Sequence, residues 1–415
     1  MLSFVRRHPL WVIVATGVAV RVVLAFAFVG PASDIIALQT VGDFLQGDFI
    51  HAYAVNDDWV GGKQIPAWPY PPAYFPWILA AVGIHNVSGL PFHGVVQLAP
   101  IAADVGIAVA IHTYLGWRGA SQRFRVAGAA LVMLGPSFIA ISGFHGQIDS
   151  VAILPGVLAL MAWERRPDST RAVNAGLLIG LGAAIKTVPG LLVLPLLPAA
   201  RSIREQARLI ATAVAVPAIL FLPFFIADPG AVEWLGTYGG LPGRGGLSLA
   251  VQPSLAFDPL TRGILARQPT EFSELVADSS TWIAIAVLVL VAVFLLRYRP
   301  APIDGAVLLW LAIYAFVPNF LMQYLVWGLP FFIMAGYLRQ TAILQAVLLP
   351  ATVIYYAVQS SGGLDERLAA LYVVTMIGLW LFWVIALATV AGRIMKRRRA
   401  SPSETQPPLV GFAGT

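Results

Sequence analysis

Ionisable side chains are few in this chain, and those that could do chemistry stand beside long apolar segments. The first is Asp34, in the run Gly-Pro-Ala-Ser-Asp directly after the first apolar segment. A carboxylate in this place can act as a general base toward a hydroxyl group. The alternative is structural, since Asp34 or Ser33 can cap a short helix that follows. Capping is the more common role of a lone aspartate, but the polar residues elsewhere in the chain favour chemistry.

Four polar side chains crowd one short turn between two apolar segments. The turn reads Phe-His-Gly-Gln-Ile-Asp-Ser and contains His145, Gln147, Asp149 and Ser150. A tight turn needs only a glycine, which Gly146 supplies. Helix capping explains Asp149 or Ser150, but it does not explain all four residues. We therefore expect this turn to bind a ligand.

Two further turns carry polar side chains. Lys186 lies between two short apolar segments, and its ammonium group suits an anionic head group such as phosphate. The alternative for Lys186 is a side chain that reaches for the membrane surface. Gln323 and Tyr324 belong to a run of amide and aromatic residues, for which an aromatic belt is the alternative. Arg21 and Asp104 lie inside apolar segments as candidate ion partners, and the sequence does not pair them.

The composition indicates which elements must position these residues. Hydrophobic residues make up 59% of the chain and charged residues only 11%, with a mean hydropathy of +0.80. A soluble domain carries about 25% charged residues, so most of this chain is not solvated by water. The net charge of +6 does not indicate nucleic acid, because the basic residues form short clusters between apolar runs. The absence of cysteine excludes disulfides and thiolate metal sites.

The chain is therefore predicted to be an all-α polytopic membrane protein with about twelve transmembrane helices (roughly 11–13), since a span needs about 20 apolar residues. Arginine clusters occupy alternate loops, and placing them in the cytoplasm puts both termini there. The turns with Asp34, His145, Lys186 and Gln323 then face outward. The expected spans are 9–29, 94–116, 126–143, 149–163, 172–185, 187–200, 207–226, 280–297, 303–318, 323–338, 341–358 and 368–392.

The spans are expected to form a single membrane domain over residues 1–400. A disordered cytoplasmic tail over 401–415, rich in Ser, Pro and Gly, follows it. Two long outer loops are expected, a catalytic one over 30–70 with short helices and a second over 227–279. The apolar segment 70–89 is expected to be a re-entrant or interfacial helix on the outer side, because a full crossing would reverse the arginine clusters that follow.

Taken in order, these motifs resemble the GT-C superfamily of membrane glycosyltransferases. Within it, the chain is similar to the mannosyltransferases of glycosylphosphatidylinositol synthesis and to related bacterial enzymes. The resemblance rests on an aspartate soon after the first span, Tyr-Pro-Pro after the first loop, Gly-Gln-Ile-Asp-Ser, Lys-Thr-Val-Pro with Leu-Leu-Val-Leu-Pro, and Gln-Tyr-Leu-Val-Trp. It implies a GT-C-like fold, a dolichyl- or polyprenyl-phosphate sugar as donor, and transfer on the non-cytoplasmic face.

The resemblance also implies roles for individual residues. Asp34 stands where the family has a catalytic base. Related eukaryotic enzymes often carry two acidic residues there, whereas this chain has Ser33-Asp34-Ile35-Ile36, so no metal site is expected. No cofactor is expected either, because the lipid-phosphate sugar is itself a substrate. Residues expected to contact the donor phosphate or sugar are His145, Gln147, Asp149, Lys186, Gln323 and Tyr324. A sugar-stacking wall is expected from Trp59, Trp68 and Tyr70.

The expected activity is that of an inverting, metal-independent hexosyltransferase, with mannose favoured by the resemblance. Its expected location is the plasma membrane of a prokaryote, with the active site on the outer face. Its partners are a polyprenyl-phosphate sugar, a lipid-linked or glycan acceptor and membrane lipids, and not nucleic acid. One alternative is a transporter or flippase, which an inverted repeat and a midplane site would favour. Another is a non-catalytic protein that binds lipid-linked glycan. These residues do not determine the sugar, the acceptor, the linkage or the oligomeric state.

Overall fold

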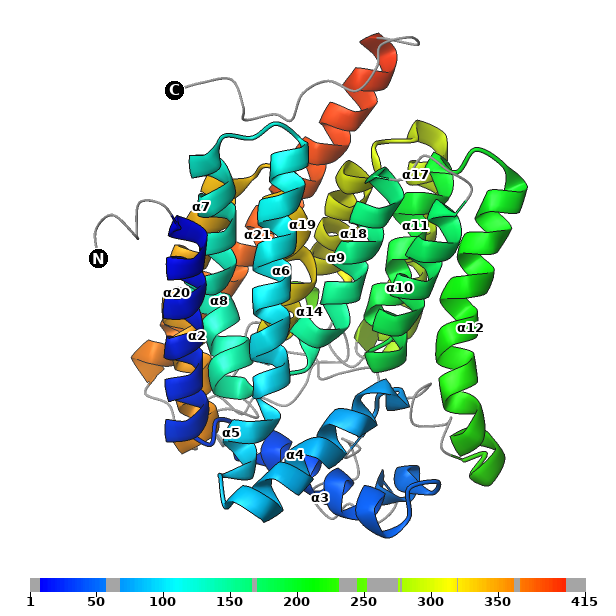
Figure 1. The fold of residues 1–415 in the computed structure, drawn as a ribbon. Helices are drawn as coiled ribbons and strands as arrows, with labels where there is room; N and C mark the ends of the chain where they lie inside the picture. The colour runs from blue at the N-terminus through cyan, green and yellow to red at the C-terminus, as the bar shows by residue number, and fades with distance from the viewer. Residues whose placement is uncertain are drawn as a thin grey trace.

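The computed structural model is an assembly of helices (Figure 1). It describes residues 8–56, 68–165, 170–230, 245–251, 275–276, 278–318, 320–361 and 366–400. Within these ranges the chain forms α-helices, short 3₁₀ turns and a π-helix, and it contains no strand. The predicted tail 401–415, Trp59 and most of the loop 227–279 lie outside the described residues.

The helix bounds follow the apolar segments of the sequence. The elements up to the middle of the chain are α2 (Pro9–Ala27), α3 (Ala32–Gly47), α4 (Phe75–Ser88), α5 (Phe92–Val96), α6 (Leu98–Trp117), α7 (Gln122–Met133), α8 (Pro136–Phe138), a π-helix (Ile139–His145), α9 (Asp149–Arg165) and α10 (Arg171–Ile185). The later elements are α11 (Val193–Leu196), α12 (Ile203–Ala227), α14 (Gly246–Val251), α17 (Ser280–Tyr298), α18 (Pro302–Phe316), α19 (Leu325–Met334), α20 (Leu338–Ser361) and α21 (Glu366–Ala400).

Seven helical segments of the described chain are long and apolar enough to cross a membrane. They are Pro9–Ala27, Phe92–Trp117, Gln122–His145, Ile203–Ala227, Ser280–Tyr298, Leu338–Ala357 and Arg367–Arg398. The other expected spans also coincide with helices, but these helices are shorter. Polytopic membrane architecture is therefore confirmed, while the number of twelve full crossings stays a prediction.

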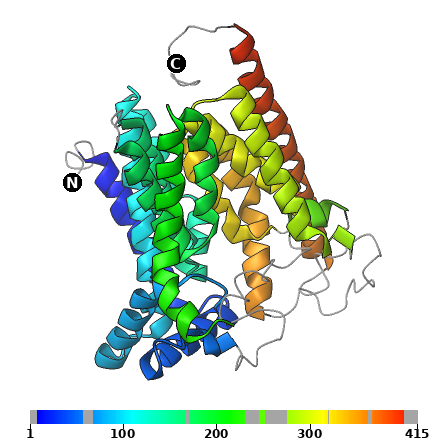
Figure 2. The ribbon, with the colours of Figure 1, turned by 90° about the vertical axis from the view of Figure 1, so that its right-hand side faces the viewer.

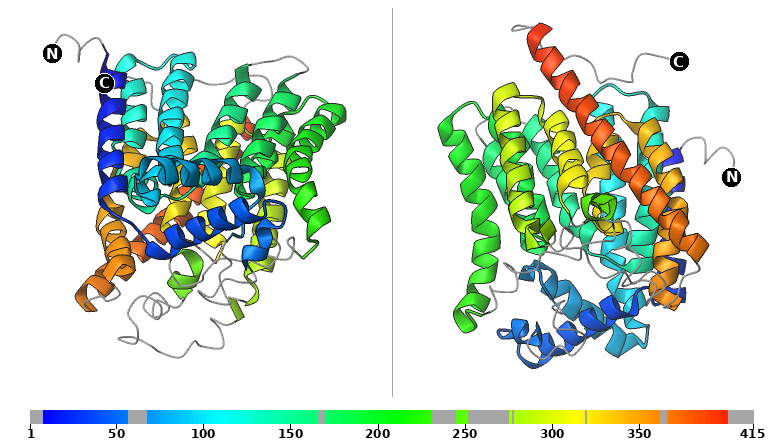
Figure 3. Two further views of the ribbon diagram at one scale, coloured as in Figure 1. Left: turned by 60° about the horizontal axis from the view of Figure 1, so that its bottom comes forward. Right: turned by 180° about the vertical axis from the view of Figure 1, so that it is seen from behind.

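The two ends of the bundle differ in character (Figure 1). At one end, which we call the basic end, lie the loops and helix ends that carry the arginine clusters, including the link from α6 to α7 and the end of α21. At the other end, which we call the α3 end, helices α3 and α4 lie across the bundle beyond the ends of the long helices (Figures 2 and 3). Helix α4 has 14 residues, which is about 21 Å, shorter than a bilayer core of about 30 Å.

The peripheral helices present apolar side chains to the surroundings. On α12, Ile219 and Ile226 are 67% and 71% exposed, and on α17, Trp282 and Leu290 are 72% and 69% exposed. In water such a surface would be unfavourable, but in a bilayer it contacts lipid chains of the same polarity. These helices therefore form the lipid-facing wall, with α12 on the outside of the bundle in Figure 2.

Helices α3 and α4 pack on the bundle through a separate apolar cluster. Its members include Tyr53, Trp68 and Phe75 of the first loop region, together with Ile148 and Ile185 of the bundle. Ile148 and Ile185 directly precede Asp149 and Lys186 in the chain. The apolar contact therefore holds the α3–α4 layer over the turns that carry these two ionisable residues.

Candidate active site

Asp34 lies in the first turn of α3, and a glycine in the preceding link sets its position. Gly30 has φ = +70°, and a Cβ atom there would lie 2.2 Å from the carbonyl oxygen of Phe144. Only glycine combines this backbone conformation with so close an approach. Pro31 then precedes the helix, and no side chain caps it. The capping role considered for Asp34 or Ser33 is therefore wrong, and the Asp34 carboxylate is used elsewhere.

The Asp34 carboxylate binds the polar turn that follows the π-helix. Its Oδ2 lies 2.7 Å from Nε2 of His145 and accepts a second hydrogen bond from Nε2 of Gln147. On the other side of the imidazole, Nδ1 of His145 lies 3.0 Å from the hydroxyl of Tyr356 in α20. His145 is buried, whereas the Asp34 side chain is 40% exposed. A continuous hydrogen-bonded chain thus runs from buried Tyr356 to the partly open Asp34.

The environment of Asp34 keeps it ionised. Burial raises the pKa of its carboxyl, but the hydrogen bond and charge of His145, with the hydrogen bond of Gln147, more than offset this and place the pKa below its usual 3.8. The N-terminal position in α3 also favours the anion. Both strong donors bind Oδ2, while Oδ1 has a long contact of 3.4 Å from the Ser33 hydroxyl. Oδ1 is therefore the oxygen that can accept a proton from a substrate.

A buried ion pair fixes the turn from behind. Arg21 Nε lies 2.9 Å from Asp104 Oδ2, and neither side chain is exposed. Asp104 Oδ1 accepts a hydrogen bond of 2.6 Å from Ser150. Gly143 lies against Arg21, where a Cβ atom would come within 2.8 Å of the arginine side chain. Arg21 and Asp104, which the sequence left unpaired, are therefore partners that brace both sides of the His145 turn.

Lys186 is paired inside the bundle rather than exposed at an outer apex. Its Nζ lies 2.8 Å from Asp149 Oδ1, and the side chains are 7% and 0% exposed. Asp149 Oδ1 also accepts a hydrogen bond from Nε1 of Trp327. The alternative of a lysine side chain that reaches for the membrane surface is therefore wrong. Helix α10 has only 15 residues, about 22 Å, so its end at Lys186 is recessed from the level that α12 reaches (Figure 1).

Three aromatic rings surround the Lys186 ammonium group. Nζ lies 4.9 Å from the ring centroid of Tyr70, 5.7 Å from that of Tyr324 and 5.4 Å from that of Trp327. Tyr324 and Trp327 stack on each other with centroids 3.8 Å apart. Such rings stabilise a cation through their negative faces. We call Lys186, Asp149 and these three rings the lysine cage.

The remaining predicted residues differ in accessibility. Trp68 is 2% exposed, stacks on Tyr74 and meets Tyr70 edge-on. No open face is left for a sugar, so the structure contradicts the stacking role predicted for Trp68. Tyr70 instead contributes to the lysine cage. Gln323 is 7% exposed, and its Oε1 has no hydrogen-bond partner among the described residues.

Sequence reasoning missed Tyr356 as a member of the site. It sits 211 positions from His145 in the chain and lies near the end of the apolar helix α20, where a tyrosine pair resembles an ordinary interfacial aromatic belt. No local pattern near Tyr356 identifies His145 as its partner. Trp327 belongs to the run of amide and aromatic residues around Gln323, and no pattern in the sequence indicates its hydrogen bond to Asp149.

Two buried acceptors near these groups are unsatisfied within the described part of the chain. They are Oδ2 of Asp149 and Oε1 of Gln323. A buried polar atom without a partner costs free energy and usually marks a water or ligand position. Hydroxyl groups, which donate hydrogen bonds, would satisfy both oxygens. No group of three or more His, Asp or Glu side chains able to hold a metal ion occurs among the described residues.

The chain is similar to known glycosyltransferases in sequence and in fold. The model of glycosyltransferase family 87 matches residues 68–322. The crystal structure of ArnT from Cupriavidus metallidurans bound to undecaprenyl phosphate is similar in fold, with a TM-score of 0.50 and 16% sequence identity over 93% of this chain and 77% of that one.

An oligosaccharyltransferase from Archaeoglobus fulgidus, solved with a tethered acceptor peptide, aligns over 97% of this chain and 56% of its own length. Its TM-score of 0.40 and identity of 13% are too low to carry an argument. No curated protein sequence matches the chain. The family match begins after Asp34 and includes His145, Asp149 and Lys186.

Proposed function

Because this chain belongs to glycosyltransferase family 87 and has a GT-C-like fold, we propose that it transfers a hexose from a polyprenyl-phosphate donor to a hydroxyl group of a lipid-linked or glycan acceptor. Mannose is the first sugar to test. The observation that carries the proposal is the oriented, ionised and partly exposed Asp34 beside His145 and Gln147. The resemblance to the GT-C superfamily inferred from the motifs agrees with the family match.

Asp34 acts in this proposal as the general base. The acceptor hydroxyl attacks the anomeric carbon, a new carbon–oxygen bond forms, and the bond from that carbon to the phosphate oxygen breaks. The acceptor proton passes to Oδ1 of Asp34, and polyprenyl phosphate leaves with the bonding electrons. A carboxylate of lowered pKa is a weak base, but it becomes effective when it is held within hydrogen-bond reach of the hydroxyl. One displacement inverts the anomeric configuration.

Polar groups for the leaving phosphate and the sugar come from the three turns that carry His145, Lys186 and Gln323. We assign Lys186 to the phosphate, because cationic N–H donors stabilise the charge that develops on it. His145, expected from the sequence in the same role, is buried with both ring nitrogens hydrogen-bonded to Asp34 and Tyr356, so it acts on the base instead. Lys186 has three N–H bonds, of which Asp149 engages one. Gln147, Asp149, Gln323 and Tyr324 are assigned to the sugar, with the unsatisfied oxygens of Asp149 and Gln323 as hydroxyl acceptors.

The proposed membrane orientation follows from the charges. The arginine clusters lie at the basic end, and arginine-rich loops stay in the cytoplasm. The α3 end then faces outward, with both termini in the cytoplasm, and the reaction takes place on the outer face of a prokaryotic plasma membrane. The undecaprenyl phosphate in the similar ArnT structure supports a polyprenyl carrier whose tail stays in the bilayer.

A transfer assay tests this proposal. Purified protein is incubated with a panel of polyprenyl-phosphate hexoses and short glycan or lipid-linked acceptors, and the product's anomeric configuration is determined by NMR. We expect one donor to give an inverted product, with no change in rate after EDTA treatment because neither a metal nor another cofactor takes part. Proton- or ion-coupled solute uptake into vesicles, without turnover of any donor, would favour the transporter alternative instead.

A further inference from the structure

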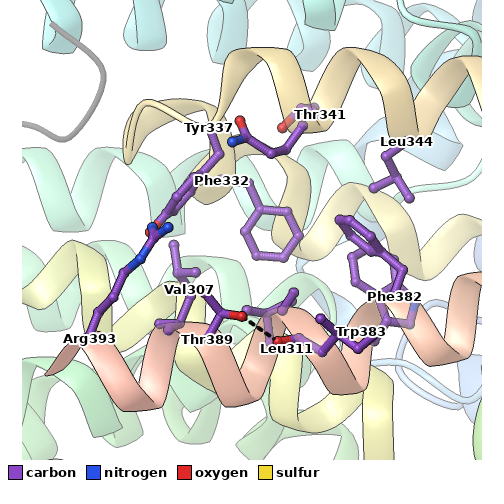
Figure 4. A pocket seen from close by; sticks show the side chains of 14 residues that line it. Val307, Leu311, Phe332, Tyr337, Thr341, Leu344, Phe382, Trp383, Thr389 and Arg393 are labelled. Atoms are coloured by element: carbon purple, nitrogen blue, oxygen red, sulfur yellow. Dashed lines mark hydrogen bonds between the residues drawn. The ribbon is translucent and has the colours of Figure 1, made fainter. Parts of the chain in front are cut away.

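A cavity at the basic half of the bundle lies away from Asp34 and has no part in the proposed transfer. Its volume is about 260 Å³, and helices α18, α19, α20 and α21 form its walls (Figure 4). Its apolar wall includes Leu311, Phe332, Leu344, Phe382 and Trp383. Phe382 and its neighbour Ile385 are 36% and 65% exposed, so the cavity opens sideways toward the surrounding lipid.

The cavity exists because α20 and α21 separate toward the basic end (Figure 3). Near the α3 end the two helices touch, and Tyr355 stacks on Tyr372 with ring centroids 6.5 Å apart. Near the basic end, Arg393 of α21 donates a long hydrogen bond of 3.4 Å to the hydroxyl of Tyr337, the residue before α20. An apolar space open to a bilayer fills with hydrocarbon rather than with water.

Polar side chains gather at one end of the cavity only. Tyr337, Gln340, Thr341 and Arg393 line that end, and Figure 4 shows Arg393 reaching toward Tyr337. The hydroxyl of Thr389 donates to the carbonyl oxygen of Ile385 in its own helix, so it adds little polarity to the wall. The cavity is therefore amphipathic, with a cationic mouth at the basic end and an apolar interior.

The length of the cavity matches one leaflet. Phe382 and Arg393 are eleven residues apart on α21, which is about 16 Å along a helix. Half of a bilayer core is about 15 Å. An acyl chain anchored by a phosphate at Arg393 would thus reach the inner end of the cavity without crossing into the other leaflet.

We propose that this cavity binds one acyl chain of an anionic diacyl phospholipid from the leaflet at the basic end, with its phosphate at Arg393. The exposed side chain of Lys396, one turn further along α21, adds positive charge beside the mouth. A polyprenyl-phosphate donor is not the occupant. Arg393 belongs to the last part of α21, and α3, which carries Asp34, lies at the opposite end of the bundle (Figure 1). The bound chain joins α20, which carries Tyr356, to the rest of the bundle.

Photo-cross-linking tests this proposal independently of transfer. Purified full-length protein is incubated with phosphatidylglycerol that carries a diazirine in the middle of one acyl chain, and cross-linked peptides are mapped by mass spectrometry. We expect cross-links within residues 305–311, 332–344 and 382–390. Unlabelled phosphatidylglycerol should compete more strongly than phosphatidylcholine, and polyprenyl phosphate should not compete. Stronger competition by polyprenyl phosphate, or cross-links spread evenly over the lipid-facing helices, would overturn the proposal.

Three variants sharpen the test. Ala386→Trp fills the cavity and should abolish cross-linking inside it, whereas Leu381→Trp adds the same ring to an exposed position on α21 outside the cavity and should not. Arg393→Gln is exposed and leaves the apolar wall intact, so it should fold. It should lower the preference for phosphatidylglycerol over phosphatidylcholine about fivefold, the effect of one cation near an anionic lipid. An unchanged preference would contradict a phosphate at Arg393, even if Ala386→Trp did not fold.

Discussion

Nε2 of His145 lies 2.7 Å from Oδ2 of Asp34, although the two residues are 111 positions apart in the chain. Because a carboxylate only accepts hydrogen bonds, Nε2 of His145 must carry the proton that is shared with it. Nδ1 then faces the Tyr356 hydroxyl at 3.0 Å. This geometry orients one oxygen of Asp34 and leaves the other for substrate, so His145 is a positioning residue for the base.

The first prediction concerns the pH dependence of transfer. The pKa of Asp34 is lowered, so its carboxylate is ionised above pH 3.8 and loses its charge only as the pH falls through the lower, folded-state value. The range from pH 5 to pH 7 lies above 3.8. We therefore expect that titration of Asp34 causes no fall in kcat/KM toward acid pH (no acid limb) within this range. The contribution of Asp34 to the free energy of unfolding is likewise present above its unfolded-state pKa. This contribution is lost as the pH falls through the lower folded-state pKa.

Replacing His145 with Phe removes the hydrogen bond and the charge while burial, which raises the pKa of Asp34, remains. The acid limb should then move to higher pH. A pH–rate profile of His145→Phe beside the wild type measures this shift. The matched control is His51→Phe, whose partner is Asp48 on the exposed end of α3. If both variants share the wild-type acid limb, His145 does not set the protonation of the base.

The second prediction concerns the buried pair of Lys186 and Asp149. Lys186→Met leaves the Asp149 carboxylate buried without its cation, which should lower the free energy of unfolding by about 3–5 kcal/mol. The double variant Lys186→Met with Asp149→Leu removes both charges and should recover most of that loss. Thermal unfolding in detergent measures both effects. Equal stability of the single and double variants would show that the two side chains are not energetically coupled.

The double variant also distinguishes a structural role of Lys186 from a role in donor binding. If Lys186 binds the donor phosphate, the stable double variant should still have a raised KM for the donor, because it has no cation in the lysine cage. Recovery of both stability and donor KM would restrict Lys186 to a structural role. A wild-type KM in the double variant is therefore the outcome that removes Lys186 from the proposed donor site.

The third prediction concerns Gly30. Alanine at this position must adopt φ = +70° and would place Cβ 2.2 Å from the Phe144 carbonyl oxygen. The link between α2 and α3 has to shift, which moves Asp34 relative to the His145 turn. A displacement of about 1 Å can cost on the order of 10²-fold in rate, so kcat should fall by that order with a folded protein. Gly47→Ala, at the far end of α3 with open space around it, is the control and should retain wild-type activity.

Much of this architecture could be predicted from the sequence because membrane spans are set by local composition. Each expected apolar segment coincides with a helix, and the polar turns are where the motifs placed them. Asp34 and His145 were both selected as candidates, since each is a polar residue beside an apolar segment that offers it little solvation. The contact between Asp34 and His145 depends on how the segment between α2 and α3, at Gly30, passes the end of the π-helix. No local sequence pattern specifies that path.

Pairings inside the bundle were harder to predict for the same reason. Lys186 and Asp149 occupy neighbouring turns, and a lysine beside a lipid surface can snorkel or form an ion pair. Which of the two occurs depends on the depth of the turn, and the short helix α10 leaves Lys186 recessed. Trp68 belongs to the predicted outer loop and was expected to stack on a sugar, yet its ring packs against Tyr70 and Tyr74. Packing across the α3–α4 layer decided its exposure.

The proposed transfer depends most on Asp34 as the base, and one measurement tests this role directly. Single-turnover transfer from the accepted polyprenyl-phosphate hexose is compared for the wild type, Asp34→Asn and the control Asp43→Asn, an exposed aspartate on the same helix. We expect Asp34→Asn to lower the transfer rate by about 10²- to 10⁴-fold while donor affinity stays near the wild-type value. Asp43→Asn should be unchanged. Transfer by Asp34→Asn at the wild-type rate would show that Asp34 is not the general base.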